Sequence, residues 1–240
     1  MTSSTTKTKG FQFKQFSILD GHSGMPVSTD GVLLGAWAQY RDSTYILDIG
    51  TGTGLLSLMI AQRYSDAQIT SIDIDAVAIQ DAEININRSP WHSRVSLLHS
   101  DVLTTPFSES FSGIICNPPY FNSGKQSKNQ HRATARHTDT LSHDQLLDAC
   151  FNLLSDEGEA SFVLPKVEGE QFIDIAQQKG WHLNRICQIH STTKKPCHRL
   201  LFTLCKQAIS LNTEHLIIHS ETGGYSKDFI ALTKDFYLKM

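Results

Sequence analysis

The segment from Tyr45 to Ala61 constrains the fold more than any other part of the sequence. The apolar run Tyr45-Ile-Leu-Asp-Ile49 is followed by a glycine-rich turn and then by the helical apolar pattern of residues 55–61. A buried strand, a glycine turn and a helix in this order form the first half of a crossover unit, which joins parallel strands of one sheet. The segment therefore predicts an α/β protein.

Strand-like and helical patterns alternate along the rest of the chain. Further strands are expected at 69–74, 95–98, 113–116, 159–164, 182–190 and 200–206, and further helices at 76–88, 143–154 and 167–179. Asp75 and Ser142 are suited to cap two of these helices. The last two strands follow each other without a helix, which predicts an antiparallel hairpin. We therefore expect a Rossmann-like, seven-stranded, mostly parallel sheet with a terminal antiparallel hairpin and helices on both faces.

A chain of 240 residues is commonly a single α/β unit. We expect a disordered tail at 1–10, a cover segment at 11–44 and a Rossmann-like core at 45–240. No apolar run approaches the ~20 residues of a membrane span, and the polar beginning lacks a signal-peptide pattern. Five cysteines without a CxxC pair suggest neither disulfides nor zinc. A cytoplasmic protein is the expectation.

The glycine-rich turn Asp48-Ile-Gly-Thr-Gly-Thr-Gly54 is the first candidate binding site. Glycines at 50, 52 and 54 let the backbone turn tightly and approach a ligand closely. The spacing differs from the GxGxxG of dinucleotide folds, and no phosphate-loop lysine follows. A carboxylate at Asp48 would attract the ammonium of a methionine moiety and repel a pyrophosphate. We therefore expect S-adenosylmethionine, bound by Asp48, Gly50, Gly52 and Gly54.

Acidic residues also end the next two predicted strands. Asp73 is placed to bind both ribose hydroxyls of the cofactor. Asp101 is placed to accept a hydrogen bond from its adenine amine. Each acid taken alone is compatible with a surface turn, but three acids at successive strand ends indicate one site.

The motif Asn117-Pro-Pro-Tyr120 follows a predicted strand and is the most specific feature of the sequence. The prolines fix the backbone and remove two donors, so that carbonyl groups are free to face a ligand. The Asn117 side-chain oxygen and the Pro118 carbonyl could hold both hydrogens of a planar amine. Tyr120 would stack on the target and Phe121 would extend that wall. We expect Asn117, Pro118, Pro119 and Tyr120 to be catalytic, with Asn117 also next to the cofactor.

These motifs together resemble the class I amino-methyltransferases with an Asn-Pro-Pro-Tyr motif. The stretches Phe11-Gln-Phe-Lys-Gln-Phe16, 25–37, 225–229 and 234–237 are similar to those of the bacterial tRNA1(Val) (adenine(37)-N6)-methyltransferases. The resemblance implies methylation of N6 of an adenine in tRNA, at position 37 beside the anticodon of a valine tRNA. It also implies that Thr29 and Asp30 lie close to the cofactor.

Charge gives limited support for RNA binding, because the net charge is −3. Three basic groups stand out: residues 7–14, residues 194–199 and the loop after the catalytic motif. We expect that loop to bind phosphates beside the target base. Its basic residues are Lys125, Lys128, Arg132 and Arg136.

Other functions stay open at this point. Enzymes that methylate the amide of a protein glutamine share the Asn-Pro-Pro-Tyr motif, but usually carry a separate helical N-terminal domain. DNA adenine methyltransferases bring a target-recognition domain, and guanine N2-methyltransferases tend to be duplicated. A cofactor-binding subunit without turnover usually lacks part of the motif. The 11 histidines show no metal-ligand spacing, so no metal is expected. No obligate protein partner is expected either.

Overall fold

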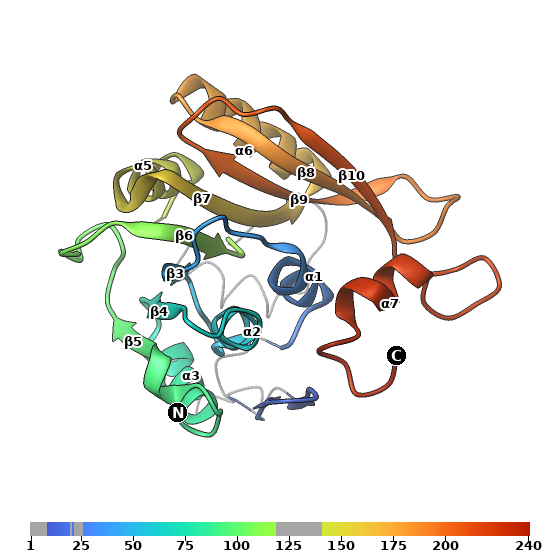
Figure 1. Cartoon of the computed structure of the whole chain (residues 1–240), viewed down its shortest axis with the longest axis horizontal. Coiled ribbons are helices and arrows are strands. Elements are labelled where there is room, and N and C mark those ends of the chain that lie inside the picture. The colour runs from blue at the N-terminus through green and yellow to red at the C-terminus, as the bar shows by residue number, and fades with distance from the viewer. Residues whose placement is uncertain (1–8, 20, 22–25, 119–140) are drawn as a thin grey trace, which may run out of the picture.

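The computed structural model describes residues 9–19, 21, 26–118 and 141–240 (Figure 1). Two short strands precede the first helix: β1 (Phe11–Gln12) and β2 (Ser17–Ile18). The main strands are β3 (Tyr45–Ile49), β4 (Gln68–Asp73), β5 (Val95–His99), β6 (Phe111–Cys116), β7 (Leu154–Pro165), β8 (His182–His190), β9 (Cys197–Cys205) and β10 (Asn212–Ile217). The helices are α1 (Thr29–Trp37), α2 (Leu55–Arg63), α3 (Ala76–Asn87), α5 (His143–Leu153), α6 (Lys166–Gln178) and α7 (Lys227–Thr233), with a 3₁₀ turn, η1 (His92–Arg94).

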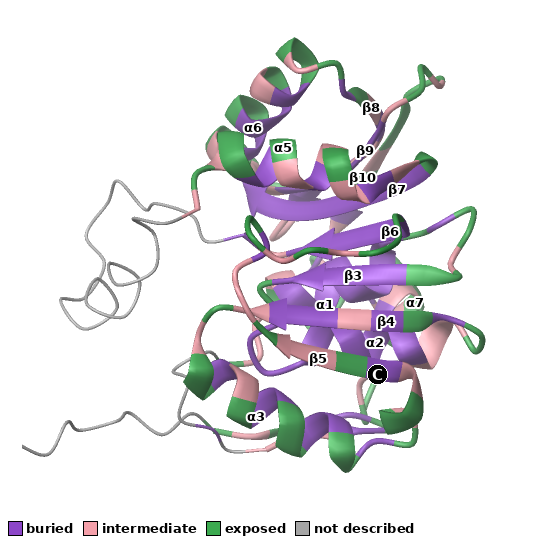
Figure 2. Ribbon diagram, turned by 90° about the vertical axis from the view of Figure 1, so that its left-hand side faces the viewer, coloured by how far each residue is buried: buried purple, intermediate pink, exposed green. Residues whose placement is uncertain are grey.

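A single large sheet runs through the middle of the molecule (Figures 1 and 2). Its strand order is β10-β8-β9-β7-β6-β3-β4-β5. All neighbouring strands are parallel except at β9, which is antiparallel to both β7 and β8. The predicted α/β fold with a mostly parallel sheet and an antiparallel hairpin is confirmed.

The predicted number of strands and the terminal place of the hairpin were wrong. In the described part of the chain the sheet has eight strands, because β10 pairs in parallel with β8 and forms the edge. The hairpin therefore lies inside the sheet. β10 was missed because it buries little side-chain area and contains no continuous apolar run.

Helices cover both faces of the sheet, as predicted. One buried cluster packs α1, α2, α3 and α7 against one face, and a second packs α5 and α6 against the other. Asp75 caps α3 by accepting a hydrogen bond from the Val77 amide. Ser142 forms a capping box with Gln145 at the start of α5. Both predicted caps are confirmed.

Helix α1 was not predicted because it is buried all around. Every residue from Gly31 to Trp37 is buried, so the sequence shows no polar face. The helix packs on α2 at Gly35, where a Cβ atom would lie 2.6 Å from the sulfur of Met59. This close approach fixes the position of α1 against α2.

The segment before α1 is held by the C-terminal part of the chain. Phe13 pairs with Tyr237 in an antiparallel bridge, and the Lys14 amide donates to the Phe236 carbonyl at 2.8 Å. The Leu19 amide donates to the Asn85 side-chain oxygen at 2.9 Å, and the Asn85 amide nitrogen donates to the Thr53 carbonyl at 2.9 Å. The N-terminal segment is thereby connected to the glycine-rich turn. The proposed tail and cover boundaries stay predictions.

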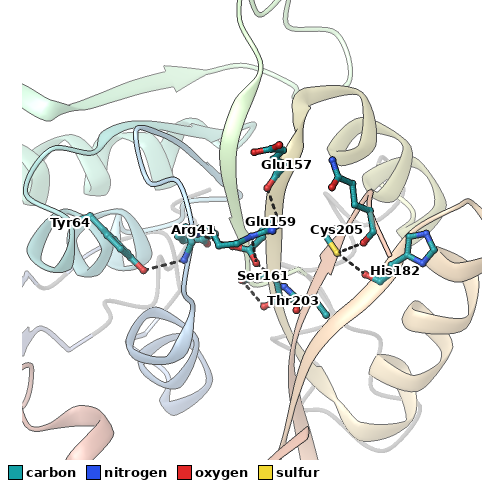
Figure 3. A network of polar contacts seen from close by, with 11 residues as sticks. Arg41, Tyr64, Glu157, Glu159, Ser161, His182, Thr203 and Cys205 are labelled. Carbon is teal, nitrogen blue, oxygen red and sulfur yellow. Dashed lines mark hydrogen bonds and ion pairs between the residues drawn. The ribbon is translucent and has the colours of Figure 1, made fainter. Parts of the chain in front are cut away.

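A buried carboxylate joins the chain before β3 to the middle of the sheet (Figure 3). Glu159 accepts hydrogen bonds from the Arg41 amide at 2.9 Å and from the Asn184 side chain at 2.7 Å. The Arg41 guanidinium lies 3.4 Å away but is half exposed. The amide contacts therefore contribute most of the stabilisation, since an exposed ion pair is worth little.

We expect Glu159→Ala to lower the free energy of unfolding by about 2–4 kcal/mol, because it leaves the buried Asn184 amide and the partly buried Arg41 backbone amide without acceptors. Arg41→Ala, which removes only the exposed partner, should cost no more than about 1 kcal/mol. Urea unfolding of both variants measures the difference. Equal losses in the two variants would contradict the assigned importance of the amide contacts.

Candidate active site

The glycine-rich turn lies between the end of β3 and the start of α2. Gly50 and Gly52 have φ values of 69° and 57°, which side chains with a Cβ rarely adopt. A Cβ at Gly50 would meet no atom within 4 Å, so the space next to the turn is open. Amides of Gly50 and Thr51 donate to the Ile72 carbonyl, which fixes the turn on β4. Gly54 is the N-cap residue of α2.

Asp48 is fully buried under this turn. Its Oδ2 atom accepts hydrogen bonds from the Thr51 hydroxyl at 2.7 Å, the Ser57 hydroxyl at 2.6 Å and the Ser57 amide at 3.1 Å. Its Oδ1 atom is buried and has no hydrogen-bond partner among the described residues. A buried carboxylate oxygen without a donor is costly, so this atom is suited to receive a donor from a ligand.

Burial raises the pKa of the Asp48 carboxyl from 3.8 to about 6, and the hydrogen bonds from Ser57 and Thr51 oppose this rise. The sequence had not singled out these two hydroxyl residues. Ser57 also lies 2.6 Å from the Ser71 hydroxyl on β4. Ser57, a polar residue within the apolar run of α2, was the sequence signal from which a buried polar contact could have been predicted.

Asp73 ends β4 beside the turn, as predicted. Its Oδ2 atom accepts a hydrogen bond from the Gly52 amide at 2.8 Å, and Oδ1 accepts one from the Asp75 amide at 2.9 Å. The carboxylate therefore shapes the turn. Each of its oxygens keeps a further lone pair for a ligand hydroxyl.

Asp101 follows β5, the neighbouring strand. Its Oδ1 atom accepts a hydrogen bond from the Leu103 amide at 2.9 Å, which is a turn geometry. The loops after β4 and β5 are joined, because the Ser100 amide donates to the Asp73 carbonyl at 3.1 Å. Ile74 and Leu103 beside these acids are exposed apolar residues that the sequence reasoning missed. They provide apolar surface for a planar ring.

Asn117 follows β6 directly, and β6 pairs with β3. Its Oδ1 atom is buried and, within the described ranges, has no hydrogen-bond partner. Pro118 is buried beside it. Two unpaired acceptor oxygens, of Asp48 and Asn117, thus come from neighbouring strands. The other predicted residues of this region lie outside the described residues: Pro119, Tyr120, Phe121, Lys125, Lys128, Arg132 and Arg136.

Thr29 and Asp30 form the first turn of α1, which Ser28 caps. Asp30 accepts a hydrogen bond from Arg199 Nε at 2.8 Å in a partly exposed ion pair. Arg199 lies on β9 opposite Pro165, the last residue of β7. The start of α1 is therefore at the same sheet edge as Asn117, while the role of Thr29 and Asp30 toward a cofactor stays a prediction.

The described part of the chain contains no group of three His, Cys, Asp or Glu side chains that could hold a metal ion. Within the same residues, no helix is long and apolar enough to cross a membrane.

Comparison with known protein families matches residues 30–167 to the methyltransferase small domain. Several relatives carry the name tRNA1(Val) (adenine(37)-N6)-methyltransferase. The protein from Vibrio campbellii is 61% identical and that from Vibrio vulnificus 59% identical, each over the full length of both chains. The protein from Aliivibrio fischeri is 52% identical over 97% of this chain and 99% of its own.

Solved structures with the same fold are distant in sequence. A predicted O-methyltransferase from Agrobacterium tumefaciens has a TM-score of 0.67 at 17% identity, over 86% of this chain and 96% of its own. A glycopeptide N-methyltransferase in complex with S-adenosyl-L-methionine has a TM-score of 0.55 at 11% identity, over 76% of this chain and 100% of its own. These likenesses show the fold alone.

We expect the affinity for S-adenosylhomocysteine to fall about tenfold per pH unit below pH 6. The expected contact with the ligand's ammonium group requires an ionised Asp48, and the raised pKa makes this carboxyl half protonated near pH 6. Calorimetry between pH 5 and 7.5 measures the effect. Asp48→Asn should bind weakly with a flat profile, and a flat profile in the unchanged protein would contradict the assignment.

Proposed function

The chain belongs to the family of tRNA1(Val) (adenine(37)-N6)-methyltransferases, and on that premise we propose that it methylates N6 of adenine 37 in a valine tRNA with S-adenosylmethionine as donor. The observation that carries this function is the Oδ1 atom of Asn117, which has no hydrogen-bond partner among the described residues and lies at the sheet edge that holds the glycine-rich turn. A buried acceptor directly after β6 suits an N–H donor of a planar amine.

The described residues fit the proposed cofactor. Asp48 Oδ1 would accept from the ammonium of the methionine moiety, and the open space beside Gly50 admits the cofactor backbone. Asp73 and Asp101 would bind the ribose hydroxyls and the adenine amine, with Ile74 and Leu103 against the adenine ring. When bound, S-adenosylmethionine supplies an electrophilic methyl group on a sulfonium sulfur.

Asn117 and Pro118 would prepare the acceptor nitrogen. The amine of adenine is a weak nucleophile because its lone pair is delocalised into the ring. Hydrogen bonds from its two N–H groups to Asn117 Oδ1 and to the Pro118 carbonyl would favour a pyramidal nitrogen with a localised lone pair. No strong general base is required, since the proton is lost after the new N–C bond has formed.

The proposal also includes residues that would bind the substrate: Tyr120, Phe121 and the basic loop residues Lys125, Lys128, Arg132 and Arg136. We assign stacking on the target base to the aromatic pair and phosphate binding to the basic residues. A tRNA substrate fits a cytoplasmic protein. The relatives' names do not favour glutamine methylation, the main alternative.

We expect Asn117→Ala to lower kcat on tRNA by about 10²–10³-fold or more, because one preorganised acceptor for the reacting amine is lost. The dissociation constant of S-adenosylhomocysteine should change little. Asn87→Ala, at an exposed site at the end of α3, provides a matched control with unchanged kcat. A retained kcat in Asn117→Ala would remove Asn117 from the mechanism.

The reaction itself is tested with labelled S-adenosylmethionine and three substrates: tRNA lacking modification, duplex DNA and a peptide-chain release factor. We expect label only in the tRNA, recovered as N6-methyladenosine on nucleoside analysis. Mapping should place it at position 37 of the valine tRNA. Label in the release factor alone would replace the proposal with glutamine methylation.

A further inference from the structure

A pocket of about 200 Å³ lies between the start of α1, the start of β9 and the C-terminal segment. Thr29 and Asp30 form one wall, and His198, His219, Tyr225 and Tyr237 contribute most of the rest. This volume is below the roughly 300–1,000 Å³ typical for drug-sized ligands, so it suits one planar ring. The proposed methyl transfer does not use the His and Tyr side chains.

The pocket lies at the edge of the sheet that holds the candidate active site. Cys116, the last residue of β6, pairs with Phe162, and Pro165 further along β7 pairs with Arg199. Arg199 is next to His198 in the pocket wall. Three residues of strand span about 10 Å and the two strand spacings add about 10 Å sideways, so the pocket lies roughly 14 Å from the end of β6, within reach of a nucleotide close to one bound at Asn117.

Stacked rings form the outer wall of the pocket. His219 and Tyr225 lie 5.4 Å apart between centroids, with an interplanar angle of 18°. Tyr225 stacks in turn on the buried Phe229 at 4.6 Å and 22°. His219 and Tyr225 are both exposed, although their rings are held by a backbone bridge between the two residues. A rigid, exposed ring pair is a suitable platform for a base.

A basic turn is fixed beside this platform. The turn joins β8 to β9 and carries the exposed residues Lys194 and Lys195. The His219 amide donates to the Ser191 carbonyl at 3.0 Å, and the Thr193 hydroxyl donates to Glu221 at 2.7 Å. Two positive charges are thus carried by a turn whose backbone is bonded to His219, while the Glu221 carboxylate accepts a hydrogen bond from Thr193.

We propose that this pocket and the Lys194–Lys195 turn bind a nucleotide of the tRNA that flanks the target adenine. Its base would stack on Tyr225 and His219, and its phosphate would contact the two lysines. The inference rests on the proposed function, because it assigns a second contact for the same substrate. Rings beside positive charges match single-stranded RNA, which presents splayed bases and phosphates together.

The polar inner wall supports a base as the occupant. His198 Nδ1 is buried and, among the described residues, has no hydrogen-bond partner. Burial, followed by the charge of Arg199, lowers the pKa of His198, so its ring is neutral at pH 7. A neutral imidazole can donate to or accept from the edge of a base. Asp30 is already neutralised by Arg199 and does not repel a phosphate.

Two variants test the proposal by steady-state methylation of tRNA. Tyr225→Leu should raise the KM for tRNA at least about 5-fold, whereas Tyr225→Phe, which keeps the ring, should leave it unchanged. The double variant Lys194→Ala/Lys195→Ala should also raise this KM. It should make the dependence of log Kd on log salt shallower by about 1.4, as expected for two lost contacts to single-stranded phosphates.

The control is Arg88→Ala, which removes an exposed positive charge at the end of α3. Its KM for tRNA should match the unchanged protein. Calorimetry with S-adenosylhomocysteine should give equal affinities in all variants, which shows that they are folded. Lys194 and Lys195 are exposed, so their replacement should leave the fold intact and tests the proposal even if Tyr225→Leu is unstable.

The outcomes separate the two proposals. If the protein without substitutions methylates tRNA and the variants show the same KM and the same salt dependence, the nucleotide site alone is overturned. A fall in kcat without a rise in KM would overturn it as well. No N6-methyladenosine in tRNA with the unchanged protein would overturn the proposed function and this inference with it.

Discussion

The carboxylate of Asp48 is fully buried, where a negative charge loses its hydration, and hydrogen bonds from the surrounding structure offset part of that loss. One oxygen is stabilised by Thr51 in the glycine-rich turn and by Ser57 in the first turn of α2. The other oxygen is buried and has no hydrogen-bond donor among the residues that the structure describes. The turn and the start of α2 are therefore positioned by one buried group, and moving either of them would leave that group with fewer hydrogen bonds.

The parallel topology places the other polar groups next to this carboxylate. Strands β4, β3 and β6 are neighbours, so the residues that follow them meet at one edge although they are distant in sequence. Asp73 reaches the turn through the Gly52 amide, and Asn117 is presented one strand away on the other side. The helix α1 and the hairpin β8–β9 extend the same edge through the Asp30–Arg199 pair.

Local patterns were sufficient to predict the residues of the turn, the strand-end acids and Asn117, because each follows a recognisable apolar strand. They could not predict α1, whose burial on all sides removes any periodicity, or β10, whose exposed edge position removes the apolar run. The contact between Asp30 and Arg199 joins residues 169 positions apart, and no local signal encodes such a pairing. The stacking of His219 on Tyr225 likewise depends on a turn geometry that composition does not reveal.

The bridge between Phe13 and Tyr237 has a consequence for synthesis of the chain. The ribosome releases this segment before the strands of the sheet, whereas its backbone partners, including the Phe236 carbonyl, follow the last strand. The apolar rings of Phe13 and Phe16, both buried in the folded protein, therefore reach their final packing only after the segment around Phe236 has emerged. The core sheet can assemble during that time, so closure of the N-terminal segment is a late step of folding.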